Sequence, residues 1–218
     1  EIDLVLVATT TPDMPVAATS VFVATQIGAV NAFAFDIQAA CSGFLYGMSS
    51  ASAYIQSGRY KKVLLIGADK MSSIIDYTDR ATCIIFGDGA GAAVLSSANI
   101  NTGFLAFRLY TDSRENKFGF TVPAGGAEFP ITEEVLKKRL QYFKMDGRAV
   151  YDMAIKVLPQ AINQVLEDTG LSINDIDIMI PHQPSIKILK KTAEIIGLPF
   201  EKIMKNMDKY ANTSGGTI

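Results

Sequence analysis

Short runs of apolar residues alternate with helical patterns along this chain, and this alternation constrains the fold more than any other feature. The predicted strands cover residues 4–8, 33–36, 63–67, 92–95, 102–110 and 176–180. Several of these runs are apolar without interruption, which is typical of strands buried on both faces. The sequence therefore predicts an α/β fold in which helices cover both faces of a mainly parallel sheet.

Three helices are predicted between and after these strands. The first begins at Cys41 and ends at Gly58, and its many small residues predict burial between two layers. The second follows an apolar stripe over residues 150–166, in which Pro159 predicts a kink or a break. The third runs from about residue 185 to 196. Residues 112–130 are predicted to form a long loop, either functional or a surface connection.

Composition excludes several classes of protein. Hydrophobic residues make up 49% of the 218 residues, which supports a substantial core, and the net charge is −2 with scattered lysines and arginines. Nucleic-acid binding is therefore not indicated. No apolar run approaches the roughly 18 residues that span a bilayer. The two cysteines lack metal-type spacing, so we expect a soluble, cytoplasmic protein without a metal site or disulfides.

Cys41 is the candidate nucleophile. It lies in Asp36-Ile-Gln-Ala-Ala-Cys-Ser-Gly-Phe44, where a buried strand ends and a helix begins. The unpaired N–H groups of a first helical turn stabilise a thiolate, so we expect the pKa of this thiol to be lowered. The second cysteine, Cys83, lies in an apolar stretch and is interpreted as a buried, inert thiol.

His182 and Asn212 are the candidate partners of Cys41. His182 is the one histidine of the sequence and follows the predicted strand 176–180. Because ligand sites gather at the carboxyl ends of strands, it can lie at the same sheet edge as Cys41. Taken alone, a histidine satisfied by hydrogen bonds and a turn asparagine are the ordinary interpretations. The presence of Cys41 favours the catalytic one.

The glycine-rich run from Phe86 to Ala92 resembles a phosphate-binding loop only superficially. It leads into a predicted strand instead of opening a helix, and it lacks the Gly-Lys-Ser/Thr of a P-loop. Tight packing is the better interpretation. The sequence contains no G-x-S-x-G, HExxH or EF-hand pattern, so a serine hydrolase or a metal enzyme is not indicated.

Three separated strings resemble the Cys-His-Asn triad of the β-ketoacyl-acyl-carrier-protein synthase III family. They are AACSGF around Cys41, PHQ at His182 and NTS at Asn212, and TDR ending at Arg80 and FGDGAGAAVL beginning at Phe86 add to the match. The resemblance implies a thiolase-like fold with two similar halves, each with a five-stranded mixed sheet, and helices between and outside the sheets. It divides the chain into residues 1–110 and 111–218, with both ends truncated relative to the family.

The resemblance also implies a reaction. Cys41 would take a short acyl group from acyl-CoA and condense it with malonyl-acyl-carrier protein, with loss of carbon dioxide and without a cofactor. His182 and Asn212 would donate hydrogen bonds to the malonyl thioester oxygen. A second oxyanion N–H, from a glycine-rich C-terminal loop of the family, is missing from this chain. Ala211 stands where the family commonly has glycine, which predicts a slightly altered turn.

Further positions follow from the same resemblance. Arg80 would hold the adenine end of CoA, although a surface salt bridge is the ordinary role of such a residue. Phe86 would line the acyl pocket, although core packing explains it nearly as well. Lys187 would receive the acidic carrier protein. Met14 would close the acyl pocket of a second copy, which predicts a homodimer.

Two other functions stay open at this point. One is another acyl-CoA acyltransferase of the thiolase superfamily. The example of hydroxymethylglutaryl-CoA synthase requires a glutamate base, for which the sequence offers no comparable acidic residue. The other is a non-catalytic fragment of the thiolase fold that serves in dimerisation or carrier-protein binding.

Overall fold

The computed structural model describes residues 1–98, 102–112 and 119–218, and they form two compact units. The sheet unit comprises Glu1–Lys70, Asp88–Phe107 and Thr213–Ile218. The helical unit comprises Met71–Gly87 and Arg108–Asn212. Both units draw on separate stretches of the sequence, so neither corresponds to one continuous half of the chain. The predicted division into residues 1–110 and 111–218 stays a prediction.

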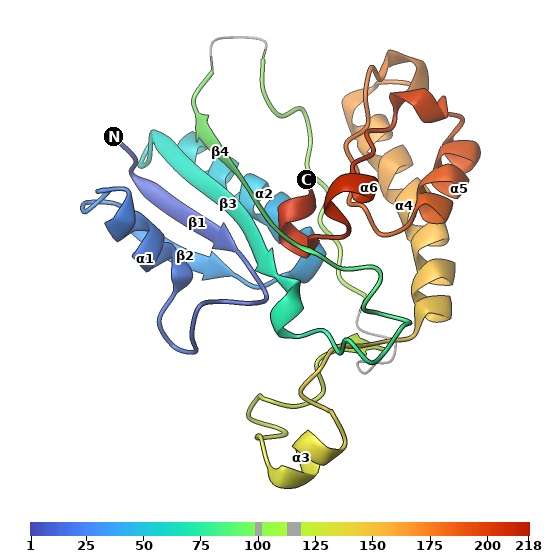
Figure 1. The fold of residues 1–218 in the computed structure, drawn as a ribbon. Coiled ribbons are helices and arrows are strands. Elements are labelled where there is room, and N and C mark those ends of the chain that lie inside the picture. The colour runs from blue at the N-terminus through green and yellow to red at the C-terminus, as the bar shows by residue number, and fades with distance from the viewer. Residues whose placement is uncertain (99–101, 113–118) are drawn as a thin grey trace. The chain divides into compact units, whose positions relative to one another are not determined.

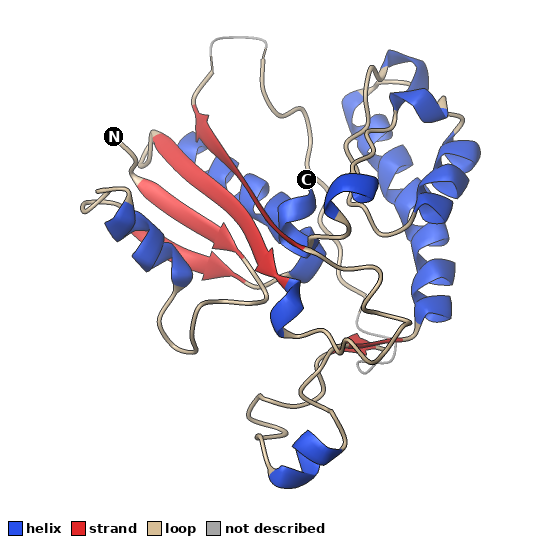
Figure 2. Ribbon diagram, viewed as in Figure 1, coloured by secondary structure: helices blue, strands red, loops and turns tan. Residues whose placement is uncertain are grey.

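The sheet unit is built on a four-stranded mixed sheet with the order β2-β1-β3-β4 (Figures 1 and 2). The central strand β1 pairs in parallel with β2 and β3, and β4 pairs antiparallel with β3. Every residue of β1 is fully buried, as its continuous apolar run predicts. The strands are β1 (Leu4–Ala8), β2 (Phe33–Ile37), β3 (Lys62–Lys70) and β4 (Asp88–Ser96).

Two helices cover the opposite faces of this sheet, α1 (Thr19–Gln26) and α2 (Gly43–Gln56) (Figure 1). Side chains alternate along β1 because successive residues of a strand point to opposite faces. Leu4 and Leu6 therefore pack in the core with residues of α2, whereas Val5 and Val7 pack in the core with residues of α1. The prediction of helices on both faces is confirmed for this sheet.

Helix α2 differs from its prediction in one respect. Its buried residues follow one stripe, and Leu45 on the other side is 42% exposed. The helix is therefore buried on one face, because the elements described for the sheet unit provide one sheet for it to pack against. Its end is as predicted, since Gly58 has a left-handed φ of 73° and follows the last turn.

The helical unit contains two longer helices, α4 and α5, packed around an apolar core of α5 and the segment that follows it. Its helices are α3 (Glu133–Lys137), α4 (Gly147–Thr169), α5 (Ile186–Ile196) and α6 (Met207–Tyr210). Its strands are β5 (Phe120–Thr121) and β6 (Lys144–Met145), which pair with each other. Short 3-10 turns in the two units cover Ala40–Ser42, Met71–Ser73, Ile173–Asp175, Phe200–Lys202 and Ser214–Thr217.

Helix α4 is longer than the predicted stripe and runs through Pro159 without a break. Asp146 caps its start by accepting hydrogen bonds from the N–H groups of Arg148 and Ala149, and Gly170 ends it with a left-handed φ of 67°. A proline removes one backbone donor, which a helix of 23 residues with caps at both ends tolerates. The predicted break is therefore wrong.

Two predicted strands are also wrong. Residues 102–110 contain no strand, and residues 176–180 contribute one isolated bridge between Met179 and Ile203. An apolar run has the propensity for a strand but forms one only beside a partner strand, and no named strand of the described chain pairs with either run. Of the predicted loop 112–130, residues 113–118 lie outside the described residues, and the remainder contains β5.

No helix among the described residues combines the length and the apolar character that crossing a membrane requires. The longest of them, α4, has one apolar stripe and a polar remainder, which suits a helix that packs on a core.

Candidate active site

Cys41 lies in the short 3-10 turn that joins β2 to α2. The residue before it, Ala40, has a φ of 47°, a left-handed conformation that is uncommon for a residue with a Cβ. The residue at the start of α2, Gly43, approaches β1 so closely that an added Cβ would lie 2.9 Å from the Cβ of Ala8. The turn is therefore sharp and pressed against the carboxyl end of β1, where ligand sites of α/β proteins gather.

The thiol of Cys41 is partly buried beside Ser214, whose Oγ lies 3.7 Å from Sγ and accepts the thiol hydrogen bond. Burial raises the pKa of the Cys41 thiol, the hydrogen bond with Ser214 opposes this effect, and the charge of Asp69 adds to it. The predicted lowering of the pKa is therefore wrong. Cys41 precedes α2 in a separate turn, and its loss of solvation is the largest cause of the raised pKa.

Asn212 is buried, with 4% of its surface exposed, and its backbone joins the segment that contains Phe86. Its N–H donates to the carbonyl of Ile85, and its carbonyl accepts from the N–H of Gly87, each at 3.0 Å. Asn212 is separated from both of these partners by more than a hundred residues of sequence. The helical unit therefore fixes the backbone of Asn212 through two hydrogen bonds.

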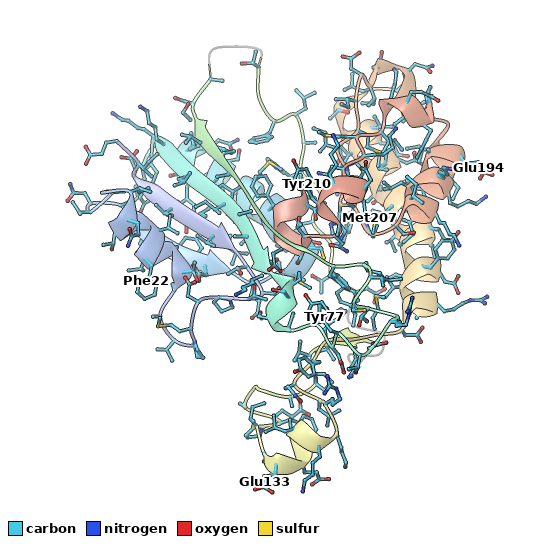
Figure 3. The ribbon with its side chains drawn as sticks, viewed as in Figure 1. Phe22, Tyr77, Glu133, Glu194, Met207 and Tyr210 are labelled. Carbon is cyan, nitrogen blue, oxygen red and sulfur yellow. The ribbon has the colours of Figure 1, made fainter. Side chains whose placement is uncertain are left out.

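Ala211 has a backbone conformation that is typical of glycine, and the predicted alteration of its turn stays a prediction. Its φ of 61° and ψ of −159° fall in a region that glycine occupies almost alone. It follows Tyr210, the exposed last residue of α6 that Figure 3 labels. A Cβ added to Gly87 would lie 2.7 Å from the Tyr210 carbonyl oxygen, so the two segments touch through their backbones.

His182 is partly buried, and its buried Nδ1 atom has no hydrogen-bond partner among the described residues. Burial lowers the pKa of His182 from 6.5 to about 4, so the ring is neutral at pH 7. The adjacent Gln183 fixes this part of the chain. Its Nε2 donates to the carbonyls of Pro181 and Met204, and its Oε1 accepts from the N–H of Asn206.

The remaining predicted residues are distributed over both units. Arg80 is exposed and forms no ion pair with any described residue, so the surface salt bridge considered above is not found there. Phe86 packs edge-on against Phe143 at 5.1 Å, in agreement with its packing interpretation. Lys187 is exposed in the first turn of α5, and Met14 is 46% exposed ahead of α1.

Cys41 belongs to the sheet unit, whereas His182 and Asn212 belong to the helical unit. Each of the three residues is therefore positioned within its own unit, and their assembly into one catalytic triad stays a prediction. Ser214 and Asp69, which lie near Cys41 in the sheet unit, are not among the predicted site residues. Ser214 is the last residue of the NTS string, and Asp69 is an acid at the end of an apolar strand. Among the described residues, no group of three potential ligands could hold a metal ion.

Solved structures show that this arrangement of strands and helices is thiolase-like. The chain superposes with a TM-score of 0.90 on a 3-oxoacyl-(acyl carrier protein) synthase III from Pseudomonas aeruginosa, at 34% identity. The superposition covers 100% of this chain and 65% of the Pseudomonas chain. The corresponding protein of Aquifex aeolicus gives a TM-score of 0.89 at 35% identity, with the same coverage. The predicted fold class is confirmed.

The family follows from the sequence comparisons. Residues 35–113 match the family model of 3-oxoacyl-[acyl-carrier-protein] synthase III, and residues 166–218 match its C-terminal model. The curated β-ketoacyl-[acyl-carrier-protein] synthase III of Chlorobium phaeobacteroides is 46% identical over the whole of this chain, which spans 67% of that relative. The chain belongs to the β-ketoacyl-acyl-carrier-protein synthase III family, a family of condensing acyltransferases. The predicted family and enzyme class are confirmed.

Proposed function

We propose that the protein initiates fatty acid synthesis by a two-step acyl transfer. The sulfur of Cys41 attacks the carbonyl carbon of a short acyl-CoA thioester, a new C–S bond forms, and CoA leaves with its sulfur. Malonyl-acyl-carrier protein then loses carbon dioxide, and the resulting enolate carbon attacks the carbonyl carbon of the acyl-enzyme. A C–C bond forms, the C–S bond breaks, and Cys41 leaves as the thiolate, which gives a β-ketoacyl-acyl-carrier protein and the free enzyme. A covalent intermediate divides one difficult condensation into easier steps.

The single observation that carries this proposal is the placement of Cys41 on a sharp turn at the carboxyl end of a central strand, in a chain 46% identical to a synthase III. The raised pKa of the thiol has a chemical consequence. Most of the thiol is protonated at neutral pH, and the thiolate that does form is strongly basic and therefore strongly nucleophilic.

His182 and Asn212 are proposed to stabilise the enolate. The neutral imidazole of His182 retains one N–H donor, and the side-chain amide of Asn212 has two. Asn212 and the Nδ1 atom of His182 are buried, and donors in such places act strongly, because water competes less for the acceptor. The low pKa of His182 supports this role, since an imidazole that must donate without transferring charge is best kept neutral.

The other positions are proposed to serve the substrates. Arg80 is exposed and unpaired with any described carboxylate, which supports a contact with CoA, and Phe86 with its aromatic neighbours supports an apolar acyl site. Exposed Lys187 supports docking of an acidic carrier protein. Exposed Met14 supports contact with a second copy in a homodimer. The cytoplasm stays the predicted location, and no cofactor is expected.

Intact-mass measurement after incubation with acetyl-CoA tests the first step. We expect a mass increase of one acetyl group on the protein and none on the Cys41→Ala variant. Absence of the adduct with acetyl-CoA and with longer or branched acyl-CoAs would refute acyl transfer and favour the non-catalytic alternative.

The second step is tested with His182→Ala and Asn212→Ala. Both variants should form the acyl-enzyme at a rate close to that of the unaltered protein, but they should release carbon dioxide from malonyl-acyl-carrier protein at least about a hundredfold more slowly. Loss of acylation instead would assign the two residues to the first step.

A further inference from the structure

Asp69 is a buried carboxylate at the end of β3, with 4% of its surface exposed. Its Oδ1 accepts hydrogen bonds from the backbone N–H of Thr10 at 2.7 Å and from the hydroxyls of Thr9, Thr10 and Thr11 at 2.9–3.2 Å. Its Oδ2 accepts from the N–H of Gly215 at 2.8 Å. Uncharged donors alone therefore solvate this carboxylate within the described chain, since it takes part in none of the ion pairs found there.

The two groups of donors come from the segments that surround Cys41. Residues 9–11 follow β1, against whose end the Cys41 turn is pressed. Gly215 follows Ser214, whose hydroxyl contacts the thiol. A Cβ on Gly67 would overlap the carbonyl oxygen of Gly215, and a Cβ on Gly215 would lie 3.2 Å from the carbonyl oxygen of Ala8. The 214–215 segment is thus held closely between β1 and β3.

We propose that Asp69 is a positioning residue for acyl transfer, whose carboxylate holds the 9–11 loop and the 214–215 segment in place around the Cys41 thiol. This inference rests on the proposed function of Cys41. The five hydrogen bonds converge on two oxygen atoms of one rigid strand, so both segments share one fixed reference point. Hydrogen bonds to an ionised acceptor are stronger than those between neutral groups, which makes a carboxylate effective here.

The charge of Asp69 has a second effect on the same reaction. It acts repulsively on a Cys41 thiolate, whereas the sulfur of a thioester is neutral. Formation of the acyl-enzyme therefore removes this repulsion. Two other charged groups lie on the same sheet. Asp36 of β2 accepts from the N–H groups of Thr19 and Ser20 at the start of α1, and Lys70 at the end of β3 is exposed.

Asp69→Asn tests the proposal because it preserves shape and removes the charge. Alkylation of Cys41 by iodoacetamide, followed by mass spectrometry across pH, should show a midpoint about half a unit or more below that of the unaltered protein. The rate of Cys41 acetylation by acetyl-CoA at saturating pH should fall at least about tenfold. The matched control Asp36→Asn removes a carboxylate of the same sheet and should leave the alkylation midpoint unchanged.

An unchanged alkylation midpoint together with an unchanged acetylation rate in Asp69→Asn would overturn the proposal. Thr10→Val provides a second test if Asp69→Asn does not fold. The Thr10→Val substitution removes one hydroxyl donor to Asp69 and retains the charge of the carboxylate. It should lower the acetylation rate about threefold or more with the alkylation midpoint unchanged, and an unaltered rate would contradict the proposal. Alkylation needs no acyl-CoA, so a protein that is alkylated at Cys41 but never acetylated refutes the proposed function without deciding the role of Asp69.

Discussion

At the scale of single residues, backbone strain is concentrated beside the candidate catalytic groups. Ala40 precedes Cys41, Ala211 precedes Asn212, and Ser214 contacts the thiol, and all three have a positive φ. Such conformations cost free energy and persist only where the surrounding structure enforces them. Strain at these positions therefore indicates that packing and hydrogen bonds hold the candidate groups firmly.

Ala211→Gly should raise the free energy of unfolding. Relief of the strained conformation is worth roughly 1–3 kcal/mol, and the greater freedom of glycine in the unfolded chain costs roughly 0.4–1 kcal/mol. The expected net gain is about 1 kcal/mol, measured as a higher midpoint in urea. Ala53→Gly, at an exposed position inside α2, is the control and should lower the midpoint by about 1 kcal/mol. A loss in Ala211→Gly would contradict the assigned strain.

At the scale of elements, β3 and β4 show how closely the end of the chain packs on the sheet. Gly67 and Gly91 face each other in the antiparallel pair. A Cβ on Gly67 would overlap the carbonyl oxygen of Gly215, whereas a Cβ on Gly91 would meet its nearest atoms at an ordinary 3.8 Å. The close approach of Gly215 therefore requires a glycine at position 67, whereas the surroundings of Gly91 have room for a Cβ.

Gly67→Ala should destabilise the protein by about 3 kcal/mol or more, because a backbone carbonyl cannot move aside as a side chain can. It should also slow acetylation of Cys41, since the displaced segment includes Ser214. Gly91→Ala should be neutral or stabilising by up to about 1 kcal/mol. Chemical denaturation of both variants measures the difference, and equal destabilisation would show that the close contact at Gly67 is absent.

A second element depends on an ion pair within the helical unit. Asp76 is 3% exposed and accepts two hydrogen bonds from Arg139, at 2.6 and 2.7 Å, and further bonds from Thr78. Arg139 holds the pKa of the Asp76 carboxyl well below its usual range. The pair joins the segment after α3 to the loop 71–87, which contains Arg80 and Phe86. Its stabilising contribution is fully present above the ordinary pKa of an aspartate and is lost only in strong acid.

Arg139→Gln should lower the melting temperature by several degrees, because the loop 71–87 loses its anchor. If Arg80 contacts CoA as proposed, the KM for acyl-CoA should rise more than kcat falls. Lys138→Gln is the matched control. Lys138 pairs with Glu134 on the exposed surface of α3, where an ion pair contributes little. Limited proteolysis of residues 122–143 should distinguish the two variants, and identical digestion would contradict the role of the Asp76–Arg139 pair.

At the scale of the whole molecule, His182 makes the stability depend on pH. The pKa is about 4 in the folded state and about 6.5 in the unfolded chain, so the unfolded state binds more protons between these values. The free energy of unfolding therefore rises with pH over this interval, by about 3 kcal/mol in total. His182→Gln should remove that rise.

Two measurements check this dependence. Urea denaturation at a series of pH values gives the slope with and without the imidazole, and the Cε1–H resonance of His182 gives its titration midpoint in the folded protein. A resonance that titrates near 6.5, with the same slope in both proteins, would contradict burial of the ring.

Much of the fold could be predicted from short stretches of sequence. The apolar run of β1 identifies a strand buried on both faces, and α5 covers Ile186–Ile196, in agreement with the helix predicted over about residues 185–196. The strings around Cys41, His182 and Asn212 identified the family. Runs 102–110 and 176–180 were wrong because a strand also needs a partner, and that partner is not encoded in the run itself.

The sequence by itself determined the periodicity of strands and helices, the ends of helices such as Gly58 and Gly197, and the identity of the candidate nucleophile, because these depend on neighbouring residues. The tertiary structure decided what depends on contacts distant along the chain. It made the Cys41 pKa higher instead of lower, since burial and the charge of Asp69 raise it more than the hydrogen bond with Ser214 lowers it. It also gathered the donors of residues 9–11 and Gly215 onto one carboxylate, which no local pattern encodes.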